Sequence, residues 1–421
     1  MEDFEQIDFF TDPSLIPSPY DYFDSLRAKC PVLPNDQYGV LAITGHDEAV
    51  AVYKDSAFSS CVTVAGPYSG VSFEPSDDDI GALIEEYRDR IPMSEHIVTQ
   101  DPPHHTRTRG LLSRLLTPRR LQENEEFMWR LADKQLDEFV AKGSCEFMRD
   151  YAKPFSMLVI ADLLGVPESD HGAFRESQYE SFAGDIDESE MVHNPLLWLE
   201  EKFTEYVTDR RREPRGDVLT ALAQAKYPDG STPEVVDVVR LATFLFAAGQ
   251  DTTTKLLSAG IRMIAEQPDL QQQIRDDREI IPGFLEEVLR LESPVKSHFR
   301  LSSRPTSIGD MPVPAGTTVM LLPGASNRDP RKFPEPNELR VDRRNVREHV
   351  AFGRGIHSCP GAPLARAEGR ISMNRILDRM GDIGIDEQQH GPAGARRYSY
   401  DPTFIMRGLS ELHIEFTPGF S

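Results

Sequence analysis

The pattern of apolar and polar positions along the chain predicts a protein built mainly from helices. Four segments are expected to be helical, at residues 106–116, 120–142, 197–212 and 270–291. Two shorter segments, 39–44 and 313–322, are rich in β-branched and apolar residues and predict strands. The sequence therefore indicates a mainly α fold with a smaller β portion.

The longest predicted helix begins at a capping box, STPE at residues 231–234, and runs to Gln267. Its length is about 34 residues, or roughly 50 Å. Residues 241–249 are apolar on every side, which is typical of a helix in the centre of a large protein. Residues 250–255 are polar, and Gly249 weakens the helix there by about 1 kcal/mol. Two interpretations fit: a short solvated stretch, or a local opening of the helix beside a buried site.

The bulk composition excludes several classes of protein. The net charge of −23 disfavours nucleic acid and anionic membrane surfaces as partners. The four cysteines are scattered and form no CxxC pair, which argues against a disulfide framework and suits a reducing compartment. The N-terminal segment resembles no signal or transit peptide, and no run of about 18 apolar residues is present. We therefore expect a cytoplasmic protein that binds neither nucleic acid nor a membrane.

Cys359 lies in a glycine-rich turn with the sequence FGRGIHSCPG. Gly353 and Gly355 permit tight backbone turns that other residues resist. A helix is predicted over residues 361–377, so Cys359 directly precedes a helix N-terminus, where backbone N–H groups and the helix dipole favour a thiolate. The plain alternative is a small buried hydrophobic residue. As a thiolate, Cys359 would be a nucleophile or a metal ligand.

The possible roles of such a thiolate differ in the partners that they need. A nucleophile needs a base, but His357 is two residues away in sequence, and the partners in such sites come from distant segments. Structural zinc needs four ligands, and the sequence offers no CxxC or HxxxH pair. Haem needs a single axial thiolate because its nitrogen ligands come with the cofactor. A lone cysteine therefore favours haem.

The cysteine turn and four further motifs resemble the cytochrome P450 family. FGRGIHSCPG matches the family's signature, Phe-Gly-x-Gly-x-His-x-Cys-x-Gly, at every fixed position. The other motifs follow the family's order and are DPPHHTRTR at 101–109, AGQDTT at 248–253, the Glu-x-x-Arg pair Glu287 and Arg290, and ASNRDP at 325–330. The resemblance covers most of the chain, and HTRTR is similar to the bacterial, ferredoxin-dependent branch.

The resemblance implies the cytochrome P450 fold as a single domain over residues 1–421, with haem b between the long central helix and the cysteine loop. Cys359 would bind the iron as a thiolate, which favours O–O cleavage. Phe352 would pack against the porphyrin, and Gly361 would direct its N–H at the sulfur because Pro360 has none. The haem propionates, which are costly to bury unpaired, would be bound by His105, Arg109, Arg300 and His357.

On the other side of the haem, the resemblance implies a place for dioxygen and a route for protons. Ala248 and Gly249 would leave room for dioxygen. The Thr252 hydroxyl would hold a water chain, and Asp251 would relay protons from solvent. The walls of an apolar substrate pocket would include Phe244, Ala247, Val295, Ser297, His298 and Phe404.

Several charged residues are expected to have structural roles. Taken alone, Glu287 and Arg290 would form an ordinary helix ion pair worth about 0.3–0.5 kcal/mol. The resemblance implies instead that they brace the cysteine loop, together with Arg343 from the segment LRVDR. Lys255, on the central helix, is expected to pair with a carboxylate.

The function implied by the resemblance is that of a haem-thiolate monooxygenase. It would insert one oxygen atom from O2 into a hydrophobic small organic substrate, most simply by hydroxylation. Electrons would come from NAD(P)H through ferredoxin reductase and ferredoxin. A peroxide-driven haem enzyme and a haem-based ligand binder or sensor are the alternatives, and the Asp251–Thr252 pair argues against both.

The partner of such an enzyme would dock on a basic surface. Residues 104–120 contain five arginines and no acidic residue, in contrast to the acidic chain as a whole. We expect this segment, with Arg354 and Arg366, to form a basic patch on the thiolate side of the haem. That patch would bind an acidic ferredoxin, and the enzyme itself is expected to be a monomer.

Overall fold

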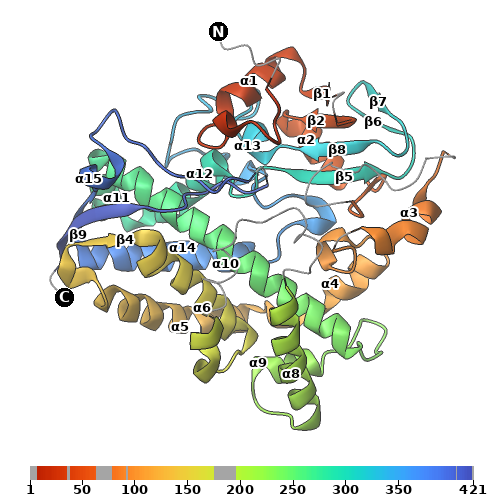
Figure 1. Ribbon diagram of the computed structural model, residues 1–421, viewed down its shortest axis with the longest axis horizontal. Helices are drawn as coiled ribbons and strands as arrows, with labels where there is room; N and C mark the ends of the chain where they lie inside the picture. Colours follow the sequence, from red (N-terminus) through yellow and green to blue (C-terminus); the bar gives the residue numbers. More distant parts are fainter. Residues whose placement is uncertain are drawn as a thin grey trace. The chain divides into compact units, whose positions relative to one another are not determined.

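The computed structural model describes residues 7–35, 38–62, 78–91, 93–174, 196–403 and 405–419, without the side chains of 113–115. Helices dominate these residues and strands are fewer, which confirms the predicted fold class (Figure 1). The chain divides into two compact units. Unit 1 contains Met1–Asp101, Lys255–Cys359 and Ile383–Ile414, and unit 2 contains Pro102–Thr254, Pro360–Asp382 and Glu415–Ser421. The single domain expected over residues 1–421 stays a prediction.

The main sheet of unit 1 packs against apolar clusters on both faces. Its described strands have the order β1-β2-β8-β5-β3, with β2 parallel to β8 and the other pairs antiparallel. Met320 of β8 joins one cluster with Phe23 and Phe299, and Val319 joins another with Val52, because successive side chains point to opposite faces. The strands are β1 Val32–Asn35, β2 Val40–Ile43, β3 Phe58–Ser59, β5 His298–Ser302 and β8 Thr318–Leu321.

The predicted helix over 270–291 is two helices in unit 1, α11 (Pro268–Asp276) and α12 (Ile281–Glu292). The Asp277 carboxylate accepts the N–H of Glu279, and a proline occupies the first turn of α12, so the chain stops and restarts. The other described helices of unit 1 are α1 Tyr20–Lys29, α2 His46–Lys54, α3 Gly81–Tyr87, α13 Pro323–Ser326 and α15 Glu387–His390.

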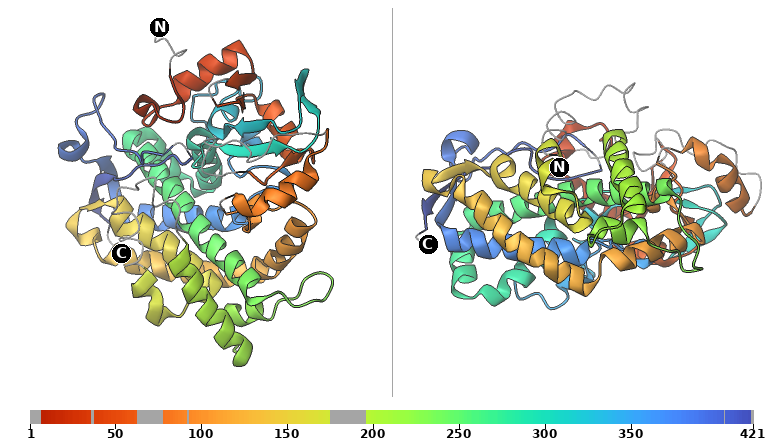
Figure 2. Two further views of the ribbon diagram at one scale, coloured as in Figure 1. Left: turned by 45° about the vertical axis from the view of Figure 1, so that its right-hand side comes forward. Right: turned by 90° about the horizontal axis from the view of Figure 1, so that it is seen from below.

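In unit 2, α5 (Pro118–Asp137) and α14 (Ala362–Arg379) run side by side (Figures 1 and 2). Ion pairs cross between them, from Arg370 to Glu125 at 2.7 Å and from Arg375 to Asp133. The other described helices of this unit are α4 His104–Leu115, α6 Lys153–Leu164, α8 Leu197–Arg212 and α9 Val218–Ala223, with a π-helical turn over Met148–Ala152. The bounds of α8 match the predicted helix over 197–212.

The long helix, α10, runs over Val235–Glu266, and the boundary between the units falls within it, after Thr254. The predicted capping box is wrong, because the Ser231 hydroxyl donates to Asp229 while the Asp237 carboxylate accepts the N–H of Glu234. The helix also continues through 250–255, so the local opening is not observed. Gly249 serves packing instead, since a Cβ there would lie 3.3 Å from Ile160 of α6.

The predicted strand over 313–322 is divided by a turn. Val313 ends β7 (Met311–Val313), Gly316 turns the chain with a φ of +80°, and Thr318 begins β8. β7 pairs with β6 (Thr306–Ile308). The remaining described strands have the order β4-β10-β9 and are β4 Ser144–Glu146, β10 His413–Pro418 and β9 Met380–Ile385. None of the described helices combines the length and hydrophobicity needed to cross a bilayer.

Candidate functional site

Cys359 is an exposed residue of the cysteine turn in unit 1. Its N–H donates to the carbonyl of Phe352 at 2.9 Å, which closes the loop. Gly353 and Gly355 have φ angles of +62° and +71°. A Cβ on Gly355 would lie 2.2 Å from the carbonyl oxygen of Tyr53 in α2, so a side chain at this position would clash with the backbone. The loop therefore requires glycine for both its conformation and its close approach to α2.

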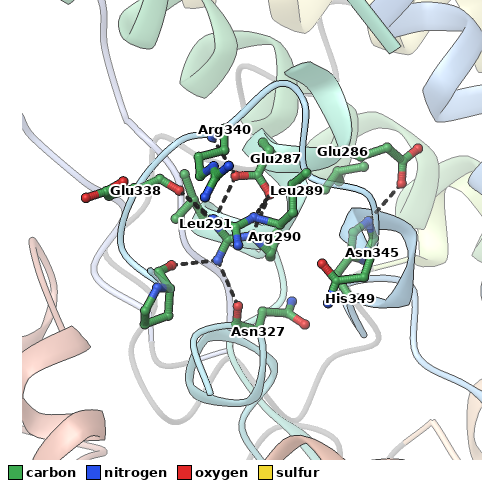
Figure 3. Close-up of polar contacts among 12 residues, drawn as sticks. Glu286, Glu287, Leu289, Arg290, Leu291, Asn327, Glu338, Arg340, Asn345 and His349 are labelled. Carbon is green, nitrogen blue, oxygen red and sulfur yellow. Dashed lines mark hydrogen bonds and ion pairs between the residues drawn. The ribbon is translucent and has the colours of Figure 1, made fainter. Parts of the chain in front are cut away.

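The fully buried carboxylate of Glu287 lies at the centre of the cluster drawn in Figure 3. Arg290 donates to it through Nε at 2.6 Å and Nη2 at 2.9 Å, and Arg343 donates through Nε at 3.0 Å. The other N–H groups of Arg290 donate, at 2.6–3.0 Å, to the carbonyls of Asn327, Pro336 and Glu338. All five donors of this guanidinium are thus satisfied. The structure brings the three predicted bracing residues together in unit 1.

This cluster carries more positive than negative charge, since Arg290 and Arg343 share one carboxylate. Burial lowers the pKa of Arg290 despite its contact with Glu287. The Arg343 guanidinium also donates to the carbonyl of Pro334 at 2.6 Å. The partial negative charges of these carbonyl oxygens therefore balance the positive charge that a second carboxylate would otherwise balance.

The entry to the cysteine loop is fixed by two buried polar side chains. The Asn327 side chain accepts the N–H of Val350 at 2.7 Å. His349 accepts the N–H of Ala351 at Nδ1, 3.2 Å away, so its proton lies on Nε2 and is donated to Glu286 at 2.9 Å. Asn327 belongs to the predicted ASNRDP motif, and the structure thus gives that motif a role in supporting the loop.

Arg300 and His298 lie on β5 of unit 1. Burial lowers the pKa of Arg300, and its guanidinium donates to the carbonyl of Phe299 at 2.6 Å. Among the residues that the structure describes, it forms no ion pair with a carboxylate. Burial, and then the charge of Arg300, lower the pKa of His298 to about 3, and its Nδ1 shares a 2.6 Å hydrogen bond with the Tyr53 hydroxyl. His298 is therefore neutral and engaged within the protein.

The segment between α12 and β5 holds two further residues predicted for the substrate pocket. Val295 is half-buried and pairs with Met406, while Ser297 is buried. Phe404, the remaining prediction in this region, lies outside the described residues. The predicted pocket residues of unit 1 thus fall on one short stretch of chain.

Sequence analysis missed Lys296, which lies between Val295 and Ser297 and is only 5% exposed. Burial, with a smaller contribution from the charge of Arg407, lowers its pKa to about 8. The available signal was a lysine within a segment already assigned to an apolar pocket. Lys255, by contrast, was expected to pair with a carboxylate, and it does so with Asp401 at 2.5 Å.

On α10 in unit 2, the predicted oxygen-side residues follow one another along the helix. The Thr252 hydroxyl donates to the carbonyl of Ala248 at 2.9 Å, one turn earlier. Ala248 is exposed, and Asp251 is half-buried. Phe244 and Ala247, predicted for the substrate pocket, are also half-buried. These side chains therefore keep accessible surface on a helix whose other residues are largely buried.

The remaining predicted haem contacts lie in both units. His105 and Arg109 are four residues apart on α4 of unit 2, so they share a face of that helix; His105 is buried and Arg109 half-buried. His357 ends the short helical turn Gly355–His357 in unit 1. Gly361, in unit 2, directly precedes α14.

The donor set fits a haem better than a metal ion bound by side chains. In the part of the chain that the structure describes, no group of three or more His, Cys, Asp or Glu residues could hold a metal. Cys359 is an exposed cysteine, and the half-buried Arg300 is a cation whose pKa burial lowers although the charge of Asp101 acts on it. A cofactor that brings its own nitrogen ligands and its own carboxylates suits both features. These are the features of a haem-thiolate protein.

Comparison with known proteins places the chain in a family. The family described as Cytochrome P450 matches residues 198–380. The cytochrome P450 monooxygenase PikC of Streptomyces venezuelae is 30% identical over 95% of this chain and 92% of its own. The 6-deoxyerythronolide B hydroxylase of Saccharopolyspora erythraea is 31% identical over 94% and 95%. The chain belongs to the cytochrome P450 family, whose cofactor is haem b and whose members are oxidoreductases.

Solved structures agree with this assignment. The substrate-free cytochrome P450 CYP150A6 of Mycobacterium marinum has 60% sequence identity and a TM-score of 0.93, covering 99% of this chain and 100% of that one. The structure of CYP109Q5 from Chondromyces apiculatus has 28% identity and a TM-score of 0.82, covering 99% of each chain. The predicted fold class is therefore confirmed at the level of the family.

Replacing Glu287 by glutamine should strongly destabilise the protein. Two buried arginines would lose their shared negative charge, and removing one partner of a buried ion pair costs about 3–5 kcal/mol. Urea unfolding of the purified variant measures the change. Glu123→Gln is the matched control, because its pair with Arg119 is exposed and should contribute little. If both variants unfold at the same urea concentration, the Glu287 cluster does not support the fold.

Proposed function

We propose that this cytochrome P450 inserts one oxygen atom from O2 into a hydrophobic small organic molecule, most simply by hydroxylation. The observation that carries the proposal is Cys359, an exposed residue on a loop that Gly353 and Gly355 turn at positive φ. A relative named as a hydroxylase supports the reaction type. The chemistry that haem b supplies when bound is the reductive activation of O2, which a thiolate ligand favours.

The residues proposed to hold the cofactor divide by chemistry. Cys359 would provide the thiolate, the half-buried Phe352 an aromatic face, and Gly361 an N–H beside the sulfur. Arg300 is proposed as a propionate partner, because burial lowers the pKa of its guanidinium and an anion there would restore its charge. The other proposed propionate partners are His105, Arg109 and His357.

Replacing Cys359 by alanine should abolish thiolate ligation and all monooxygenase activity. The carbon monoxide difference spectrum of the reduced protein measures this directly, because its main band distinguishes thiolate-bound haem from histidine-bound haem. Cys30→Ala, at a half-buried cysteine outside the turn, should leave the spectrum unchanged. A Cys359→Ala protein that keeps the thiolate-type band would overturn the assignment.

The proposed proton route uses Thr252 and Asp251. The Thr252 hydroxyl donates to the Ala248 carbonyl at 2.9 Å, so its oxygen remains an acceptor that can hold a water molecule. Asp251 precedes it on the helix and would take protons from solvent and pass them to that water. Ala248 and Gly249, one turn earlier, carry no side chain beyond a methyl group and would leave space for dioxygen.

Replacing Thr252 by alanine should uncouple electron consumption from product formation. Haem and substrate should still bind, while product per NADH falls by about tenfold or more and hydrogen peroxide accumulates, because the water that Thr252 holds for proton transfer loses its acceptor. Thr204→Ala is a matched control, since that exposed hydroxyl makes the same bond to a carbonyl one turn earlier on α8, at 2.7 Å. Unchanged coupling in Thr252→Ala would mean that protons enter by another route.

We also propose that an acidic ferredoxin delivers the electrons, to a monomer that works in the cytoplasm. The structure modifies the predicted docking patch, because several of its arginines have partners. Arg107 stacks on Tyr227 at 3.8 Å, and Arg119 and Arg120 both bind Glu123, at 2.9 and 2.8 Å. Arg354 donates to backbone carbonyls, of Arg347 and His349. The side chain of Arg114 lies outside the described residues.

Replacing Arg119 by glutamate should raise the apparent KM for ferredoxin several-fold. The Arg119 side chain is 87% exposed, so its charge can act on a docking partner. The effect should shrink in high salt, where the Debye length falls below about 8 Å. Arg212→Glu, at an arginine of α8 that is 79% exposed, is the control and should change little. If neither salt nor Arg119→Glu alters the electron-transfer rate, the ferredoxin docks elsewhere.

A further inference from the structure

Lys255, on the part of α10 that belongs to unit 1, connects this helix to a turn near the end of the unit. Its side chain is 2% exposed, and its ammonium binds the Asp401 carboxylate at 2.5 Å. The turn spans residues 400–409, of which Phe404 lies outside the described residues, and the N–H of Asp401 donates to the carbonyl of Gly408 at 3.1 Å across it. The ion pair therefore joins two segments that are 146 residues apart in the chain.

The aliphatic part of the Lys255 side chain packs against the buried Gly408. A Cβ on Gly408 would lie 2.2 Å from the Cγ atom of Lys255 and 2.6 Å from its Cδ atom. Glycine at this position therefore leaves the space that the lysine occupies. Lys255 thus contacts both arms of the turn, the first through its ammonium at Asp401 and the second through its methylene groups at Gly408. Contacts with both arms fix the turn against α10 more closely than either contact alone.

Backbone hydrogen bonds hold the second arm of the turn to the segment between α12 and β5. The N–H of Arg407 donates to the carbonyl of Pro294 at 2.8 Å, and the N–H of Lys296 donates to the carbonyl of Ile405 at 2.6 Å. These two bonds set the register of the turn against that segment, because each one places a residue of the turn opposite a residue of the segment. The ion pair of Lys255 adds the connection to α10.

The same pairing decides which side chains of the turn face the proposed substrate pocket. Val295 pairs directly with Met406, and side chains of directly opposite residues lie on the same face. Both residues are apolar and half-buried, and Val295 is one of the residues predicted for the pocket. Arg407, the next residue of the turn, points to the other face, where it is buried and donates to Glu292 at 3.0 Å. Met406 therefore joins Val295 in the wall of the proposed pocket.

We propose that Lys255 is a positioning residue that determines which ligands fit the substrate pocket, through the place that it gives to Met406. This inference rests on the proposed monooxygenase function and adds a residue that sets its specificity. Because Lys255 is on α10 and Met406 is on the turn, the ion pair with Asp401 couples the position of this wall to the helix. An ion pair with a partly exposed member contributes little to stability, so we expect its effect on ligand fit rather than on folding. A displacement of about 1 Å at such a wall can change a rate by about 100-fold.

The test measures ligand fit with three imidazoles that bind the haem iron of the holoenzyme. Imidazole reports on the iron, whereas the larger groups of 4-phenylimidazole and 1-dodecylimidazole also pack against the pocket. Each compound is titrated by the shift of the main haem absorption band. Asp401→Asn should weaken the binding of the two larger compounds by about fivefold relative to imidazole, because the wall that they contact loses its connection to α10.

Variants of the lysine test whether the two residues act as a pair. Lys255→Met should have the same effect as Asp401→Asn, and the double variant should show no further weakening. Lys255→Arg should keep part of the wild-type affinity ratio, because a guanidinium can still bind the Asp401 carboxylate. Glu48→Gln is the matched control, since its carboxylate is 18% exposed and pairs with the distant Arg331 at 2.7 Å elsewhere in unit 1. It should leave the affinity ratios unchanged.

Two results would overturn the inference. One is a wild-type affinity ratio in both Asp401→Asn and Lys255→Met, even at a lower melting temperature, which would assign the pair to stability alone. The other is an equal weakening of all three imidazoles, which would place the effect at the haem. If Lys255→Met does not fold, Asp401→Asn and Lys255→Arg decide the question. A wild-type protein without a thiolate-type carbonyl band would instead refute the proposed function.

Discussion

The structure around the cysteine depends on one carboxylate, that of Glu287, with no exposed surface. It joins α12 to the segment that leads toward the cysteine turn, through Arg290 on its own helix and Arg343 beyond it. A buried ion pair is a weak source of stability by itself, because desolvation costs as much as the attraction returns. Its value here is geometric: every N–H of Arg290 has an acceptor, so there is one arrangement of the surrounding carbonyls that satisfies all of them.

The interior of unit 1 has a charge balance opposite to that of the whole chain. The protein carries a net charge of −23, yet Arg290, Arg343 and Lys296 are buried cations and Arg300 is a half-buried one. Backbone carbonyls compensate the first pair. Arg300 of β5 donates to the carbonyl of Phe299 at 2.6 Å, and the charge of Asp101 acts on it.

Much of this could be predicted from the sequence, and the failures have physical causes. The family, the fold class and the residues of the Glu287 cluster followed from motifs whose spacing is fixed by contacts within the fold. The start of α10 could not be predicted in this way, because the Asp237 carboxylate, not the predicted capping box, accepts the N–H of Glu234. The predicted helix over 270–291 is two helices, because a capping aspartate and a proline interrupt it, and the pattern of apolar residues does not reveal either. Lys296 was missed because a lysine in sequence gives no sign of being buried; only tertiary packing removes its water.

The contact between Gly355 and Tyr53 limits how the protein can be recombined with its relatives. A Cβ at Gly355 would lie 2.2 Å from the Tyr53 carbonyl oxygen. The backbone at the end of α2 therefore restricts the conformation of the cysteine turn, which lies more than three hundred residues later in the chain. In a chimera, α2 and the turn must therefore come from parents with the same backbone spacing at this point. Crossover sites that separate the two elements would preserve every side chain of the turn and still distort the position of its sulfur.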